Sequence, residues 1–168
     1  MEINEIITLF DYNCWAIEKV IKSTSNLSAN QFTAQTPCSH GSLRGTIVHI
    51  LSAEWIWRLR CQEGISPDQF IDEKHFLTPE SLGLRLIDEQ SKMRKFLSTL
   101  DNSDLQSSIE YKTTKGAVYK NTLWHLIMHL FNHGTHHRSE VAEMLSRYGH
   151  SPGGIDFIIF LRDLKSNT

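Results

Sequence analysis

Four long segments of this chain carry apolar residues at helical spacing, and they constrain the fold more than any other feature. Apolar side chains recur every three or four residues from about 3 to 22, 43 to 63, 79 to 100 and 122 to 148. Such spacing places one apolar stripe along each helix. Four amphipathic helices with short connections bury their stripes against one another in a bundle. The sequence therefore predicts an all-α protein with a four-helix bundle.

The helix ends carry recognisable sequence signals. Ser39 or Ser42 can cap the second helix, which is expected to end before Gly64. Thr78 followed by Pro79 marks the start of the third helix, because proline lacks the N–H group that the first turn would leave unpaired. These signals place the starts of the two middle helices.

The last third of the chain contains two smaller predicted elements. Alternating residues on either side of a turn predict a small β-hairpin within 107–120. Asn121 or Thr122 then caps the longest helix, which ends before Gly149. A short C-terminal helix is expected over 155–164.

The composition is that of an ordinary globular protein. The chain of 168 residues, with 40% hydrophobic and 21% charged residues, has the size of a single domain spanning 1–168. Its net charge is −2, and its short basic runs at 58–60 and 92–95 are expected on solvated helix sides, so no nucleic-acid partner is predicted. The sequence contains no run of about 18 apolar residues, so no membrane-spanning segment is predicted. Three cysteines without paired spacing and the lack of a signal sequence predict a reduced, cytoplasmic protein.

Histidine is concentrated in the last long helix. Five of the nine histidines lie between 125 and 137, and His129, His133 and His137 recur every four residues on one helix face. Neighbouring Cβ atoms on such a face are about 5–6 Å apart, so two rings can bind one ion. The pairs His129–His133 and His133–His137 are geometrically equivalent. Spacing therefore leaves open which pair binds a metal, and exposed histidines without a metal are the simpler alternative.

A catalytic zinc site usually takes three protein ligands, so a further ligand should come from a facing helix. The histidines outside the cluster are His40, His49, His75 and His150. Only His49 lies within a predicted amphipathic helix, beside the core-facing Ile47. A histidine there needs a partner, which a shared metal would supply. A core histidine bonded to a backbone carbonyl explains His49 equally simply when it is considered alone.

Other catalytic patterns are missing from the sequence. Gly134 follows His133 where a His-Glu-x-x-His protease requires glutamate, and neither a phosphate-binding loop nor a nucleophile elbow occurs.

Glu140 lies three residues after His137 and four after His136. It is the candidate catalytic residue, as a base or as a group that orients a ligand, and a surface pair with His136 is the alternative.

The run from Phe131 to Arg138 reads Phe-Asn-His-Gly-Thr-His-His-Arg and closely resembles the signature of the DinB/YfiT-like family of metal-dependent enzymes. Residues 11–16, 39–57 and 149–157 resemble further parts of that family in the same order, so the likeness covers most of the chain. One difference is that the family usually continues His-Arg-Gly-Gln, whereas Ser139 and Glu140 stand here. The difference places a carboxylate beside the expected site.

This resemblance implies a bundle whose helices run up-down-down-up, often as a homodimer. It also implies a divalent metal, zinc or nickel, held by His49, His133 and His137, with His129 and His136 in packing or supporting roles. The implied reaction is hydrolysis, or transfer of a low-molecular-weight thiol onto a small electrophilic substrate. The alternative function is a non-catalytic metal-binding module of a stress response.

Overall fold

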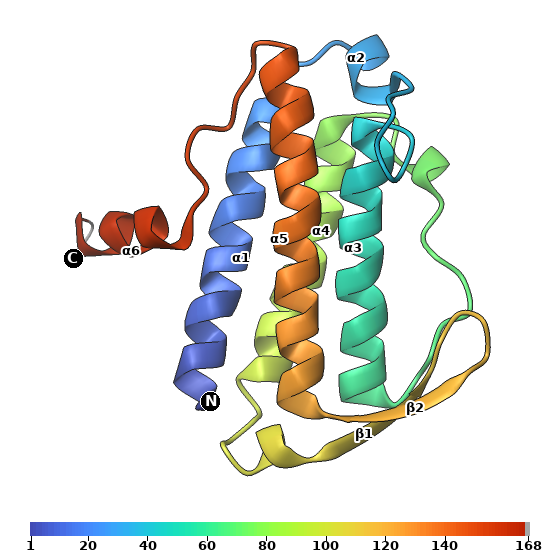
Figure 1. Ribbon diagram of the computed structural model, residues 1–168, viewed down its shortest axis with the longest axis vertical. Coiled ribbons are helices and arrows are strands. Elements are labelled where there is room, and N and C mark those ends of the chain that lie inside the picture. Colours follow the sequence, from blue (N-terminus) through green and yellow to red (C-terminus); the bar gives the residue numbers. More distant parts are fainter. Residues whose placement is uncertain (167–168) are drawn as a thin grey trace.

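The computed structural model describes residues 1–166, and its main feature is a bundle of four long helices (Figure 1). These helices are α1 (Ile3–Thr24), α3 (Leu43–Arg58), α4 (Pro79–Leu97) and α5 (Leu123–Arg147). In Figure 1, α1 and α5 run upward while α3 and α4 run downward. Helices α1 and α3 each pack against both α4 and α5. The predicted up-down-down-up bundle is confirmed.

The two middle helices begin where their capping signals predicted. The Ser42 side chain accepts a hydrogen bond from the Gly45 amide at 2.9 Å, and the Thr78 side chain caps α4 with Pro79 in its first turn. Helix α3 continues into a π-helical turn, η1 (Leu59–Glu63). It stops at Gly64, whose φ of +66° lies in the left-handed region that favours glycine.

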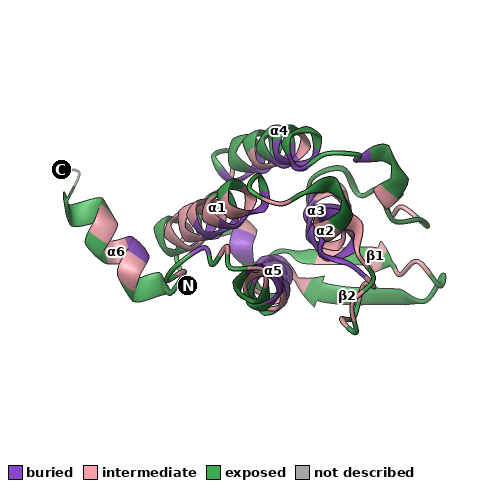
Figure 2. Cartoon of the chain, turned by 90° about the horizontal axis from the view of Figure 1, so that it is seen from above, coloured by how far each residue is buried: buried purple, intermediate pink, exposed green. Residues whose placement is uncertain are grey.

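The smaller elements lie around the bundle (Figure 2). They are α2 (Ala29–Thr33), η2 (Glu73–His75), η3 (Asp104–Gln106), β1 (Ser108–Lys112), β2 (Val118–Thr122) and α6 (Phe157–Ser166). Strands β1 and β2 form the predicted antiparallel hairpin, which contacts η1 and α5. The terminal helix α6 begins two residues later than expected and packs Phe160 against Tyr12 and Trp15 of α1. No helix among the described residues is long and apolar enough to cross a membrane.

A buried polar layer crosses the middle of the bundle and separates the core into two apolar clusters. Each long helix contributes one member; these are Asn13, Glu54, Glu89 and Arg138. Arg138 donates to Asn13, which in turn donates to Glu54 Oε1 at 2.9 Å. Burial raises the pKa of Glu54 to about 7, although the hydrogen bond from Asn13 and the charge of Arg138 act in the opposite direction.

Gly134 of the signature run leaves room for this layer. A Cβ atom at position 134 would lie 2.8 Å from Arg138 Nη1 and 2.9 Å from Asn13 Oδ1. Any side chain would therefore displace the guanidinium from its buried partner. Gly134 serves the packing of the core, whereas His133 and His137 contact His49 of α3.

The expectation that the first basic run lies on a solvated helix side is wrong. Arg58 and Arg60 are each only 6% exposed. Arg58 forms an ion pair with Glu89 of α4, and Arg60 donates from Nη2 to the Lys112 carbonyl of the hairpin at 2.8 Å. Both side chains are buried against neighbouring elements, α4 for Arg58 and the hairpin for Arg60. A count of charges along the sequence does not reveal such contacts. The second run, 92–95, has the expected exposed charged residues.

Candidate metal centre

Four imidazole rings gather where α3 faces α5, and they belong to His40, His49, His133 and His137. The ring centroids of His49 and His133 are 4.8 Å apart, those of His49 and His137 4.7 Å, and those of His133 and His137 4.5 Å. The Nε2 atoms of His49 and His133 face each other at 2.9 Å. Two consecutive turns of α5 thus present histidines to one histidine of α3.

The chemistry of these donors fits a divalent transition metal. Burial, together with the neighbouring imidazoles, lowers the pKa of His49 to about 4 and that of His133 to about 3. Both rings are therefore neutral at neutral pH and have a nitrogen lone pair to donate. His133 also has a buried Nδ1 atom without a hydrogen-bond partner. Neutral imidazoles are suitable ligands for zinc, nickel and copper.

Glu140 orients the imidazole of His137. Its Oε2 atom lies 2.9 Å from His137 Nδ1, and both carboxylate oxygens accept from the Ser39 hydroxyl, at 3.0 and 2.9 Å. A carboxylate on one ring nitrogen fixes the tautomer and leaves the other nitrogen available to a metal. The exposed His136 is farther from Glu140, at 3.7 Å. The geometry therefore favours the orienting role of Glu140 over a surface pair with His136.

His40 is a site residue that sequence reasoning considered and did not select. It precedes the cap of α3, and its ring stacks on that of His49 with centroids 3.7 Å apart and planes 19° apart. Nitrogen atoms of His40, His49 and His137 lie within 4.8 Å of one another. Gly45 permits this arrangement, because a Cβ atom there would lie 2.3 Å from the His40 carbonyl oxygen. The sequence signal was the position of His40 directly before the helix that carries His49.

Of the remaining histidines, the exposed His136 is in contact with this group, since its ring centroid lies 4.9 Å from that of His137 and it forms a second possible metal-binding group with His137 and Glu140. His129 occupies the stripe one turn before His133, but it is exposed, with its ring edge-on to Trp57 at 5.2 Å. His75 lies in η2 and is exposed, and His150 follows the end of α5. The structure thus separates the two equivalent pairs of the stripe, since His137 rather than His129 lies beside both His49 and His133.

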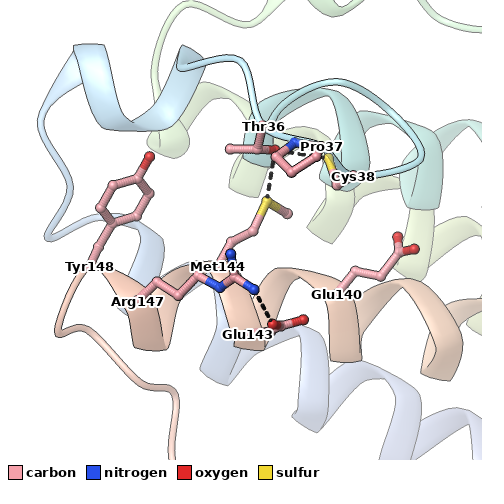
Figure 3. Close-up of a pocket in the computed structure, with 8 residues that line it drawn as sticks. All are labelled: Thr36, Pro37, Cys38, Glu140, Glu143, Met144, Arg147 and Tyr148. Carbon is pink, nitrogen blue, oxygen red and sulfur yellow. Dashed lines mark hydrogen bonds and ion pairs between the residues drawn. The ribbon is translucent and has the colours of Figure 1, made fainter.

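Two cavities are lined by histidines, and a third lies nearby. One, of about 190 Å³, is lined by His49, His129 and His133 and extends to Trp57, Arg60 and Phe70. Another, of about 330 Å³, is lined by His40 and His49 on one side and by Asp72 and Glu73 on the other. The third, of about 350 Å³, lies beside Glu140 (Figure 3). Its lining residues are Thr36, Pro37, Cys38, Glu140, Glu143, Met144, Arg147 and Tyr148. Of these three cavities, only the one of about 190 Å³ is lined by both His49 and His133, so it is the candidate substrate pocket.

Comparison with known proteins agrees with this fold. The DinB family model matches residues 1–164. The chain belongs to the DinB family. A curated relative, Protein DinB of Bacillus subtilis (strain 168), is 21% identical over 164 residues, which cover 91% of each chain. The family named from the signature run is therefore confirmed.

Two solved structures are similar to this DinB-family chain. A DinB-like protein from Bacillus cereus gives a TM-score of 0.66 at 17% identity, covering 91% of this chain and 97% of the other. YfiT from Bacillus subtilis gives a TM-score of 0.61 at 17% identity, covering 88% and 90%. YfiT is described as a probable metal-dependent hydrolase with an unusual four-helix bundle topology. At these identities the likeness establishes the fold.

Proposed function

We propose that this DinB-family protein is a metal-dependent enzyme that holds a divalent ion with His49, His133 and His137. The observation that carries the proposal is the contact among these three rings, whose centroids lie 4.5 to 4.8 Å apart, with a 2.9 Å approach between the Nε2 atoms of His49 and His133. Zinc and nickel suit this donor set. The description of YfiT as a probable metal-dependent hydrolase supports the same reading.

A divalent ion bound there supplies a Lewis acid that can lower the pKa of a water molecule or thiol and polarise a carbonyl. Glu140 keeps the His137 ring in one tautomer, and the 190 Å³ cavity receives the substrate beside His49 and His133. The proposed reaction is hydrolysis of a small molecule or transfer of a low-molecular-weight thiol onto a small electrophile. Both reactions require an activated nucleophile and a confined electrophile.

Metal analysis of protein purified without a histidine tag tests the proposal. We expect about one zinc or nickel ion per chain, since three protein ligands form one catalytic site. A screen of esters and amides, and of thiols with electrophiles, should then detect an activity that a chelator removes and added metal restores. Protein that binds no stoichiometric ion would contradict the proposal, as would an activity that survives complete removal of metal.

The alternative is a metal-binding module without catalysis, and the position of His40 favours it. A fourth imidazole would close the ligand shell, as in structural zinc sites. However, the lone pair of an imidazole nitrogen lies in the ring plane, so the stacked rings of His40 and His49 do not aim at a common ion. His40 would have to rotate before it could complete the shell.

We therefore expect His40→Ala to retain one ion per chain and the visible spectrum of the cobalt-substituted protein. Cobalt absorption responds to the number and type of ligands, so a lost ligand would alter it. The same spectrum from His75→Ala, which removes an exposed ring of η2 outside the group of four rings, is the control. A changed spectrum and loss of cobalt in His40→Ala alone would support the closed shell and the non-catalytic module.

The family resemblance also implies a homodimer in the cytoplasm. Both features stay predictions. Sedimentation of the purified protein would establish the first of them, and neither affects the ligand set proposed above.

A further inference from the structure

The cavity beside the histidines has two chemically distinct sides. His49 and His133 line one part of it, and Arg60 lines another, about three helical turns from His49 along α3 and η1. The rest of the lining consists of four apolar residues, Ala53, Ile56, Trp57 and Phe70, and three polar ones, Thr113, Thr114 and His129. A ligand that fills the cavity therefore meets the imidazoles of His49 and His133 in one part and the Arg60 guanidinium in another.

Arg60 is a buried cation without a carboxylate partner. Among residues 1–166 the buried arginines are Arg58, Arg60 and Arg138. Arg58 pairs with Glu89, and Arg138 is linked to Glu54 through Asn13. No ion pair among the described residues includes Arg60. Its Nη2 donates to a backbone carbonyl at 2.8 Å, and its buried Nε has no partner.

The residues in contact with Arg60 do not neutralise its charge. Its guanidinium carbon lies 4.7 Å from the centroid of the Trp57 ring and 5.2 Å from that of the Tyr111 ring. The Tyr111 hydroxyl donates to Asn121 Oδ1 at 3.1 Å. Burial raises the pKa of the adjacent Cys61 thiol to about 12, so this thiol is uncharged at neutral pH. Buried charges in proteins are normally paired, and an arginine always carries its charge.

We propose that the substrate of this site carries a carboxylate that pairs with Arg60. Its apolar body packs against Trp57 and Phe70, and its reacting group lies at His49 and His133. The guanidinium then gains the counter-ion that the protein does not provide, in a setting where charge-assisted hydrogen bonds are strong. This inference rests on the proposed function for the reaction at the histidines, whereas the carboxylate site itself does not require a metal.

Binding of benzoate and of benzamide to the full-length protein tests the inference. The two probes have nearly the same shape, but only benzoate is an anion. In metal-free protein, followed by calorimetry and tryptophan fluorescence, we expect benzoate to bind about ten- to a hundredfold more tightly than benzamide, since hydrogen bonds to charged groups are stronger. Arg60→Gln should reduce benzoate binding to the level of benzamide, and Arg60→Lys should retain part of the preference.

Arg147→Gln is the matched control, because Arg147 is paired with Glu143 and lines the cavity beside Glu140. It should bind benzoate like the unmodified protein. The inference is overturned if metal-free protein binds no benzoate, if it does not distinguish the probes, or if folded Arg60→Gln binds benzoate normally. If Arg60→Gln does not fold, the inference is tested by the benzoate binding of Arg60→Lys and by the comparison of benzoate with benzamide in the unmodified protein.

The same experiment separates this inference from the proposed function. A benzoate preference in metal-free protein supports the Arg60 site even if no stoichiometric metal is found in the purified protein. Benzoate that binds only to zinc-loaded protein, and equally to Arg60→Gln, would instead be bound at the histidines. That result would overturn the Arg60 site and leave the metal site intact.

Discussion

Substitution of His49 by alanine (His49→Ala) is expected to abolish stoichiometric metal binding while the helical bundle remains folded. His49 is the proposed ligand from α3, and the remaining pair, His133 and His137, both come from α5. Loss of a residue that merely supports a ligand already weakens metal binding by about 10–100-fold, so loss of a ligand should cost more. Zinc content after dialysis and calorimetric titration with zinc measure the effect.

Thermal or urea unfolding with and without zinc gives an independent measurement. An ion that binds only the folded chain stabilises it by about 2.7 kcal/mol when its concentration is 100 times Kd. The unmodified protein should show this gain, and His49→Ala should not. His129→Ala is the control, because it removes an exposed ring of the same stripe whose centroid is 5.9 Å from that of His133. Retention of zinc by His49→Ala would show that the proposed ligand set is wrong.

The fold followed from the sequence because its signals are local. Apolar spacing located the four long helices, and the capping residues Ser42 and Thr78 marked where two of them begin. The rotation of each helix about its own axis is not local, since it depends on the packing of all four. Because of this rotation, His137 lies beside His49 and is only 7% exposed, whereas His129 lies beside Trp57 and is exposed. The resemblance to the DinB/YfiT-like family supplied this choice, which spacing alone did not.

The polar layer could have been inferred from the sequence. Asn13 lies three residues after Phe10 and four before Ile17, and Glu89 lies three after Leu86 and four before Met93, so both occupy core-facing positions. A polar or charged residue at such a position predicts a buried partner on another helix. The identity of that partner could not be inferred, because it depends on which helices are neighbours in the bundle.

The same layer gives the largest expected effect on stability. Glu89 is fully buried and forms ion pairs with Arg58 of α3 and, at 3.0 Å, with Arg85 of its own helix. Glu89→Ala would remove the fully buried partner of the Arg58 guanidinium and leave it only Gln62 and the more exposed Glu63. Removing one member of a buried ion pair typically lowers the free energy of unfolding by about 3–5 kcal/mol. Urea unfolding followed by circular dichroism measures this change.

Two further variants identify the cause of that loss. Glu89→Gln keeps the shape and one acceptor oxygen but removes the charge, so its stability should fall between those of the unmodified protein and Glu89→Ala. Asp88→Ala removes a neighbouring carboxylate that also contacts Arg85, but this carboxylate is half exposed and its pairs are screened by solvent. Asp88→Ala should therefore change stability little. An equal loss in Asp88→Ala and Glu89→Ala would mean that the buried pair between α3 and α4 does not hold these helices together.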